Sequence, residues 1–159
     1  MIIEYNKIYA EQVKDLFGEL QEYIASLDEE GYNIVGEDFR EQYFKETMDE
    51  IRKYQGKMFL YKEDGKIVGL IIGIINNEEI DCYNFKAPKR GRITDLVVKR
   101  NCKGKGIGKK LMHYMEDYLK SNGCKDTLVG VFSFNITAID FYKSCGYKRR
   151  MTEMIKTNI

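Results

Sequence analysis

The sequence predicts one α/β (α+β) domain that spans residues 1–159. Three observations lead to this fold class. Apolar residues recur at helical spacing in two N-terminal segments, an Asp-Gly pair separates two strand-like runs, and a glycine-rich loop joins a further strand to a further helix. The elements follow in the order β-α-α-β-β-β-β-α-β-α-β, and 159 residues are enough to bury a core.

The N-terminal part begins with a predicted strand over residues 1–5 and continues with two amphipathic helices. The first helix covers residues 10–27 and the second covers residues 39–54, and the acidic link 28–31 separates them. Apolar side chains every three or four positions form one face on each helix. These apolar positions are Val13, Leu16, Phe17, Leu20, Ile24 and Leu27 in the first helix, and Phe39, Tyr43, Met48, Ile51 and Tyr54 in the second.

A hairpin follows the second helix. The strand-like runs 58–61 and 67–75 flank a short polar segment that contains Asp64 and Gly65. The Asp-Gly pair is typical of a tight hairpin turn. We expect a further short strand over residues 80–85, then a basic loop, and then a strand over residues 92–98.

The C-terminal part alternates helices and strands. The helix after the glycine-rich loop carries a core stripe formed by Ile107, Leu111, Met115 and either Tyr118 or Leu119, and the single histidine, His113, lies off that stripe and faces solvent. We expect a strand over residues 127–132, a helix that ends at Cys145, and a left-handed turn at Gly146. A last strand is expected over residues 147–156.

The glycine-rich loop is the most informative segment. Three glycines alternate over five positions between a strand and a helix, so backbone N–H groups and the positive end of the helix dipole converge on one point. This arrangement suits a pyrophosphate. The spacing excludes a Walker A loop, because the residue five positions before Gly108 is Lys103 rather than glycine. It also excludes a dinucleotide-binding fingerprint, because the position three residues after Gly106, where that motif has its third glycine, is Lys109.

The spacing of the basic residue and two glycines identifies a family. Lys103, Gly106 and Gly108 resemble the acetyl-CoA loop of the GNAT superfamily of N-acetyltransferases, usually written Arg/Gln-x-x-Gly-x-Gly/Ala, with lysine in place of arginine. Downstream, the segment from Asn135 to Tyr147 resembles the "Asn…Ala…Phe-Tyr…Gly-Phe/Tyr" segment of the same family. The resemblance is specific over residues 92–150, and over residues 1–56 it concerns only the order of elements.

The resemblance implies a mixed, mostly antiparallel sheet flanked by about four helices, and acetyl-CoA as co-substrate. The strand before the loop then pairs with the pantetheine arm, the loop N–H groups hold the pyrophosphate, and Arg100 and Lys103 reach the 3′-phosphate. The cofactor-binding residues implied in this way are Leu96, Val97, Val98, Lys103, Gly104, Lys105, Gly106, Ile107, Gly108, Lys109, Asn135 and Tyr142.

Two residues are the catalytic candidates. By the resemblance, the Tyr142 hydroxyl faces the departing sulfur and acts as general acid. Many relatives carry a glutamate nine residues before the loop's basic residue, but this chain has Thr94 there and Asp95 one position later. Since successive strand residues face opposite sides, Asp95 does not simply replace that glutamate. Asp95, an ordered water, or an acid from the N-terminal helices could each accept the proton.

Charge is unevenly divided along the chain. Residues 1–56 hold 14 acidic and 6 basic residues, whereas residues 57–159 hold 11 acidic and 20 basic residues. The basic half suits CoA. The acidic half suits a cationic amine, such as a polyamine, an aminoglycoside-like molecule or a lysine-bearing peptide. Its candidate residues cluster around the turn between the first two helices: Asp28, Glu29, Glu30, Glu37, Asp38, Glu41, Tyr32, Phe39 and Tyr43.

The function expected from these features is transfer of an acetyl group to a primary amine by direct attack in a ternary complex. The alternative is a non-catalytic acyl-CoA-binding sensor. We expect no bound metal, because the four cysteines are scattered and His113 stands alone. We also expect no nucleic-acid partner and no membrane span, a cytoplasmic location without a signal peptide, and a homodimer as one option for assembly.

Overall fold

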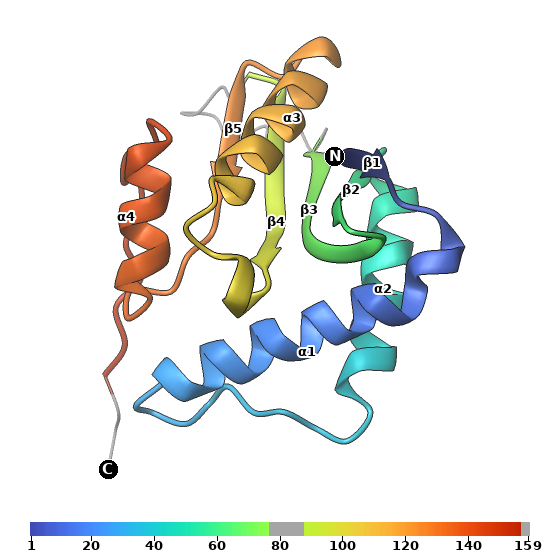
Figure 1. The fold of residues 1–159 in the computed structure, drawn as a ribbon. Helices are drawn as coiled ribbons and strands as arrows, with labels where there is room; N and C mark the ends of the chain where they lie inside the picture. The colour runs from blue at the N-terminus through green and yellow to red at the C-terminus, as the bar shows by residue number, and fades with distance from the viewer. Residues whose placement is uncertain (77–87, 157–159) are drawn as a thin grey trace.

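The computed structural model describes residues 1–76 and 88–156, and within them a five-stranded sheet carries four α-helices (Figure 1). Strands β1 to β4 are antiparallel neighbours, and β5 joins β4 in parallel. The elements are β1 (Ile2–Glu4), η1 (Lys7–Tyr9), α1 (Ala10–Leu27), α2 (Phe39–Lys53), β2 (Lys57–Glu63), β3 (Lys66–Asn76), β4 (Arg90–Val98), η2 (Arg100–Cys102), α3 (Ile107–Ser121), β5 (Asp126–Val129) and α4 (Ile136–Ser144).

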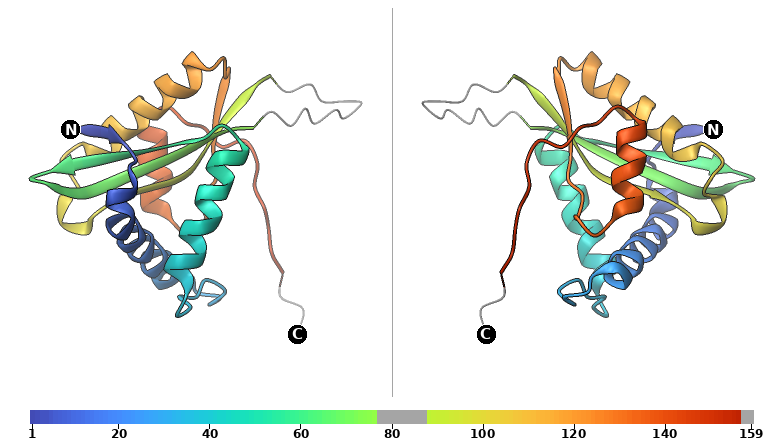
Figure 2. Two further views of the ribbon diagram at one scale, coloured as in Figure 1. Left: turned by 90° about the vertical axis from the view of Figure 1, so that its right-hand side faces the viewer. Right: turned by 90° about the vertical axis from the view of Figure 1, so that its left-hand side faces the viewer.

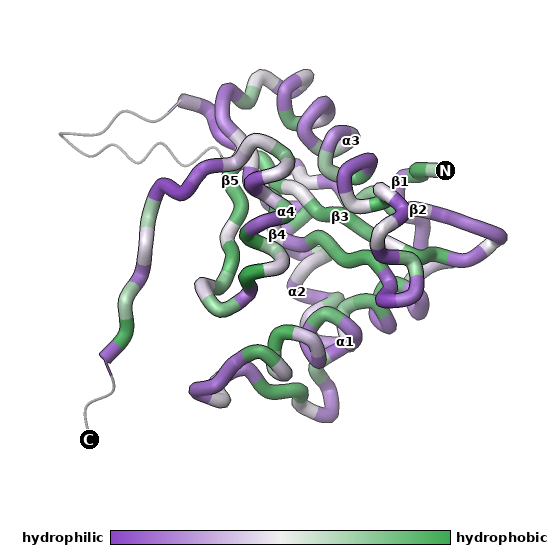
Figure 3. The backbone as a smooth tube through the Cα atoms, turned by 60° about the vertical axis from the view of Figure 1, so that its left-hand side comes forward, coloured by the Kyte–Doolittle hydropathy of each residue, from purple (hydrophilic) through white to green (hydrophobic). Residues whose placement is uncertain are grey.

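The sheet separates two apolar clusters. Helices α1 and α2 lie on one side of it and α3 lies on the other (Figure 2). Strand β3 supplies both clusters, since Leu70 and Ile72 pack on the α1 side while Ile71 and Ile75 pack on the α3 side. A strand buried on both faces needs a nearly continuous apolar run, which explains the composition of β3 and its hydrophobic colouring in Figure 3.

Most predicted elements are confirmed. The turn between β2 and β3 has Asp64 at φ 48° and Gly65 at φ 79°, as a tight Asp-Gly hairpin requires. Helix α3 buries Ile107, Leu111, Met115 and Leu119, and His113 is exposed. Helix α4 ends in a Schellman turn, in which Tyr147 N–H donates to Tyr142 C=O at 3.0 Å and Gly146 N–H donates to Lys143 C=O at 2.9 Å.

Two predicted strands differ from the structure. The strand expected over residues 127–132 is shorter, because β5 ends at Val129. The strand expected over residues 147–156 is wrong: these residues have no regular structure, and the chain after α4 runs away from the sheet (Figures 1 and 2). Three consecutive basic residues, 148–150, follow Tyr147 and are exposed, so no alternating apolar face holds the segment against a strand. The strand expected over residues 80–85 lies outside the described residues.

Among the residues that the structure describes, none of the helices combines the length and apolar character needed to cross a membrane.

Candidate functional site

The two parallel strands, β4 and β5, lie at one edge of the sheet and diverge. Strand β5 pairs with β4 only from Arg90 to Ile93, whereas β3 pairs with β4 as far as Val98. The edge of β4 over residues 94–98 that faces away from β3 therefore has no strand partner among the described residues. This edge includes the predicted residues Leu96, Val97 and Val98, and its backbone groups are available to an extended ligand.

The glycine-rich loop lies directly beyond this edge. Gly104 and Gly106 have φ values of 79° and 75°, so both occupy the left-handed region that a residue with a Cβ enters only at a cost. Helix α3 begins at Ile107, and no side chain caps its N-terminus. The first N–H groups of the helix, which have no intrahelical acceptor, are therefore free to bind an anion.

Gly108 serves a different purpose from the other two glycines. A Cβ at Gly108 would lie 3.2 Å from both Cε2 and Cζ of Phe141. The missing side chain lets α4 pack closely against the first turn of α3. The third glycine of the motif thus brings Tyr142, the neighbour of Phe141, toward the loop.

The loop lysines contact side chains from distant elements. The Nζ atom of Lys103 lies 4.6 Å from the centre of the Tyr23 ring on α1, and Lys105 Nζ lies 3.3 Å from Glu63 Oε2 at the end of β2. Glu63 raises the pKa of Lys105 through their hydrogen bond. The sequence did not indicate Tyr23 or Glu63 as neighbours of the loop. Tyr23 is 80 positions from Lys103 and Glu63 is 42 positions from Lys105, and no local pattern reports contacts over such distances in the chain.

Asn135 has a visible structural role. It is buried, and its Oδ1 accepts a hydrogen bond from Ala138 N–H at 3.1 Å, which caps the N-terminus of α4. Asn135 therefore fixes the start of the helix that carries Tyr142. Its contact with the cofactor stays a prediction.

Tyr142 lies near the C-terminal end of α4, with Phe141 and Tyr147 edge-on to its ring at centroid distances of 5.5 and 6.0 Å. Burial raises the pKa of Tyr142 to about 12, and the charges of Asp95 and Cys145 add to this effect. The hydroxyl thus stays protonated at neutral pH, as a hydrogen donor must.

A β-bulge decides the orientation of Asp95. Ile72 of β3 pairs with Asp95 and the next residue, Gly73, pairs with Ile93, so Thr94 is an extra residue in β4. The strict alternation used in the sequence argument is therefore wrong at this position. Ile93 belongs to the apolar cluster beneath α3, whereas Val97 belongs to the cluster beneath α1. Asp95 faces the α1 and α2 side.

Asp95 is almost fully enclosed, with 5% of its surface exposed. Its Oδ1 accepts a hydrogen bond from the hydroxyl of Tyr43 on α2 at 2.7 Å. Burial raises the pKa of Asp95, and the hydrogen bond from Tyr43 opposes part of that rise. A carboxylate whose proton affinity is raised by burial is a suitable proton acceptor.

A second polar group lies at the bulge. Thr94 Oγ1 is buried and makes no hydrogen bond of normal geometry. It nevertheless lies close enough to Asp95 to lower the pKa of that carboxylate. The site thus combines an unpaired β4 edge, an uncapped helix N-terminus and a buried carboxylate with two nearby hydroxyls.

The acidic turn between α1 and α2 is partly used by the fold itself. Asp28 Oδ2 accepts hydrogen bonds from Asn33 N–H and Nδ2 at 2.7 Å each, and Glu41 pairs with Lys14 at 2.6 Å. Phe39 stacks on Tyr43 with ring centroids 5.1 Å apart. The stack of Phe39 and Tyr43 thus lies beside Asp95, and the turn keeps fewer unpaired carboxylates than the sequence indicated.

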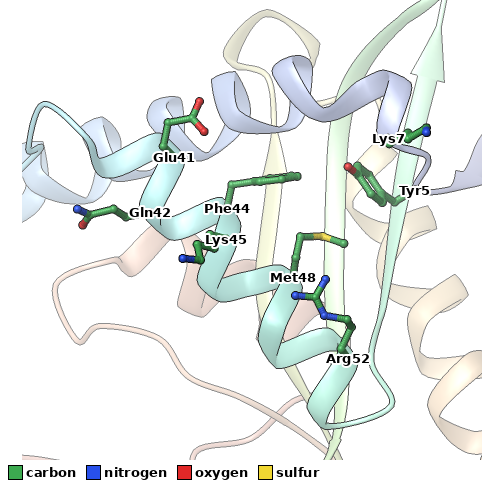
Figure 4. Close-up of a pocket in the computed structure, with 8 residues that line it drawn as sticks. All are labelled: Tyr5, Lys7, Glu41, Gln42, Phe44, Lys45, Met48 and Arg52. Carbon is green, nitrogen blue, oxygen red and sulfur yellow. The ribbon is translucent and has the colours of Figure 1, made fainter.

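A separate hollow of about 540 Å³ lies between α2 and the segment after β1 (Figure 4). None of the predicted catalytic or cofactor residues lines it, so it is distinct from the site at the β4 edge. Its lining residues are Tyr5, Lys7, Glu41, Gln42, Phe44, Lys45, Met48 and Arg52.

Comparisons with known proteins agree with this geometry. MJ1530, an uncharacterised N-acetyltransferase of Methanocaldococcus jannaschii, is 32% identical over 98 residues, which cover 61% of this chain and 56% of that protein. The chain thus matches little more than half the length of that curated relative.

Solved structures show the same fold. A mutant of the BH1408 protein from Bacillus halodurans superposes with a TM-score of 0.86 at 18% identity, with 99% of each chain covered. The aminoglycoside N-acetyltransferase AAC(6')-Iy in complex with CoA superposes with a TM-score of 0.72 at 12% identity, covering 100% of this chain and 99% of that one. A family model described as Acetyltransferase (GNAT) family matches residues 28–147. The chain therefore belongs to the GNAT acetyltransferase family.

Proposed function

We propose that this protein is an acetyl-CoA-dependent N-acetyltransferase that moves an acetyl group directly to a primary amine. The observation that carries the proposal is the unpaired edge of β4, which leads from the buried carboxylate of Asp95 into the glycine-rich loop and the uncapped start of α3. Such a track suits an extended thioester with an anionic end.

Acetyl-CoA would bind along this track. The backbone of Leu96, Val97 and Val98 would pair with its pantetheine arm, and the N–H groups from Gly104 to Lys109 would hold the pyrophosphate. The amide of Asn135 lies at the start of α4, on the same side as the loop helix. The structurally similar aminoglycoside N-acetyltransferase AAC(6')-Iy was solved in complex with CoA, which supports CoA as the ligand class. When bound, the thioester supplies the activated acetyl group.

The protein would move two protons. The amine must be neutral to attack, and Asp95 accepts its proton. As the new N–C bond forms and the C–S bond breaks, the nitrogen loses its second proton and the leaving sulfur gains one, with the Tyr142 hydroxyl as hydrogen-bond donor to that sulfur. The side chains come from opposite sides of the proposed thioester, since Asp95 faces α2 and Tyr142 belongs to α4.

The acceptor would be a cationic amine. Its acidic wall would be the turn between α1 and α2, which leads into the stacked rings of Phe39 and Tyr43 beside Asp95. Aromatic faces and carboxylates both bind ammonium groups. Exposed apolar residues of the same turn, Tyr32 and Ile34, would contact the carbon skeleton of the acceptor.

The test is release of free CoA from acetyl-CoA in the presence of polyamines, aminoglycosides, amino acids or lysine peptides. Turnover that is confined to multiply charged amines supports the proposal and the acidic wall as its selector. Acetyl-CoA binding by calorimetry without turnover on any amine would favour the alternative, a non-catalytic acyl-CoA sensor.

Assembly and location are proposed on separate observations. Met151, Met154 and Ile155 are exposed on the C-terminal segment, which favours a homodimer that covers them; sedimentation analysis would test it. Free thiols at Cys102, Cys124 and Cys145 favour a reducing compartment such as the cytoplasm.

A further inference from the structure

Tyr43 links the acceptor-side helix to the reaction centre. Its hydroxyl donates to Asp95 Oδ1 at 2.7 Å, although 52 positions separate the two residues in the chain. The ring of Tyr43 is held on two sides, edge-on by Phe17 at 4.9 Å and in a stack with Phe39 at 5.1 Å. A ring fixed in this way directs its hydroxyl to one point.

The hydrogen bond is not needed to attach α2 to the sheet. Phe39, Phe44, Met48 and Ile51 of α2 already pack against the apolar cluster that contains Phe17. A phenylalanine at position 43 would keep both ring contacts. Burying a hydroxyl and a carboxylate together instead costs solvation free energy, so the pair is expected to serve a purpose other than packing.

The charges around Asp95 explain why a donor is required. The charge of Glu50 on α2 raises the pKa of Asp95, and the charge of Asp95 in turn raises the pKa of the Tyr142 phenol on α4. Neither group supplies a positive charge that would stabilise the Asp95 carboxylate. The Tyr43 hydroxyl donates to Asp95 Oδ1 at 2.7 Å, and the adjacent Thr94 side chain also lowers the pKa of Asp95, more weakly than Tyr43 does. Burial and the charges of Asp95, Glu50 and Glu46 raise the pKa of Tyr43, so its hydroxyl remains a donor throughout the neutral range.

We propose that Tyr43 is a positioning residue for acyl transfer, whose hydroxyl holds the Asp95 carboxylate ionised and oriented toward the incoming amine. This inference rests on the proposed function. In the step concerned, one proton of the ammonium group passes to the free oxygen of Asp95 while Oδ1 keeps the hydrogen bond of Tyr43. The amine lone pair then forms the N–C bond as the C–S bond breaks, and the second proton of the nitrogen passes to the departing sulfur beside Tyr142.

The proposal is tested with Tyr43→Phe, which removes only the hydroxyl. Tyr118→Phe is the matched control, because Tyr118 donates its hydroxyl to the Gln55 carbonyl at 2.9 Å, away from Asp95. The carboxyl carbons of 13C-labelled aspartate are titrated by NMR in the wild type and both variants, and Asp95→Asn assigns the Asp95 signal. This measurement needs no acceptor.

We expect the titration midpoint of Asp95 to rise by about one pH unit in Tyr43→Phe, the size that one hydrogen bond to a carboxylate supplies, and to stay unchanged in Tyr118→Phe. With an amine that is turned over, the acidic limb of the pH profile of kcat/KM should move upward by the same amount. The kcat at neutral pH should fall roughly tenfold, without a further fall when Tyr43→Phe is added to Asp95→Asn.

Three outcomes would overturn the inference: an unmoved Asp95 midpoint, an acidic limb that stays in place while kcat falls at every pH, or an equal loss in the Asp95→Asn background. Each of these leaves the proposed function standing if Asp95→Asn itself loses most of its turnover but keeps a measurable residual activity. If Asp95→Asn instead keeps wild-type turnover, the assignment of Asp95 as proton acceptor fails first, and the positioning role fails with it.

Discussion

Replacing Tyr142 with phenylalanine removes one hydroxyl from the proposed leaving-group side of the site. The ring would keep its contacts with Phe141 and Tyr147, and the structure gives the Tyr142 hydroxyl no hydrogen-bond partner within the described residues. Tyr142→Phe should therefore change the free energy of unfolding by less than about 0.5 kcal/mol. Any loss of turnover then reports on chemistry rather than on folding.

The expected loss of turnover follows from the pKa of Tyr142. Burial raises it to about 12, whereas an ordinary thiol has a pKa near 8.5, so complete proton transfer to the thiolate would be uphill by about 5 kcal/mol. Tyr142 should thus stabilise the leaving sulfur mainly as a hydrogen-bond donor. Removal of one such donor costs roughly 100- to 1,000-fold in kcat.

The assay is steady-state release of CoA with the amine that the panel identifies, together with calorimetric titration of CoA. We expect kcat to fall in that range while the Kd for CoA changes by less than about twofold. Tyr147→Phe is the control: it loses the hydrogen bond from Tyr147 to Glu116 at 2.8 Å but keeps a ring in the same place, and its kcat should be maintained.

Two results would refute this reasoning. A kcat within about threefold of the wild type would remove Tyr142 from the mechanism. A fall of about 10,000-fold or more would show that complete proton transfer is required, and that the pKa of Tyr142 in the ternary complex differs greatly from its value in the free protein.

Three further predictions follow from the same geometry. Burial raises the pKa of Asp95, so the folded protein loses stability as the pH rises from the pKa of the unfolded state, near 3.8, through the pKa of the folded state. Asp95→Asn should therefore be more stable than the wild type at pH 7, by about 1.4 kcal/mol for each unit of pKa difference, and as stable as the wild type in acid. Thermal melts that show the same difference at every pH would contradict this. Gly108→Ala places a Cβ 3.2 Å from Phe141, so it should weaken CoA binding and lower the free energy of unfolding by about 1–2 kcal/mol. A thermal melt and a CoA titration that both match the wild type would contradict this. Asn135→Ala removes the cap on α4 and should cost about 1 kcal/mol, while Asn135→Asp restores the cap; if both variants bind CoA as tightly as the wild type, Asn135 is a structural residue only.

The sequence alone determined the elements whose formation depends on neighbouring residues. Helical spacing placed α1, α2 and α3 with their buried faces, the Asp-Gly pair placed the β2–β3 turn, and Gly146 placed the end of α4. The glycine-rich loop was also identifiable, because φ preference and helix-terminus electrostatics act over a few residues. These local features were sufficient to identify the family.

Only the tertiary structure decided how the site is assembled. The bulge at Thr94 exists because β3 and β4 pair in a shifted register, and no local pattern in β4 indicates it. That single extra residue turns Asp95 toward α2 and into contact with Tyr43. The sequence expectation of a final strand failed for the same physical reason, since a strand forms only where a partner edge accepts it. Spacing within a segment fixes which side chains can share a face, but the pairing of distant segments fixes which faces meet.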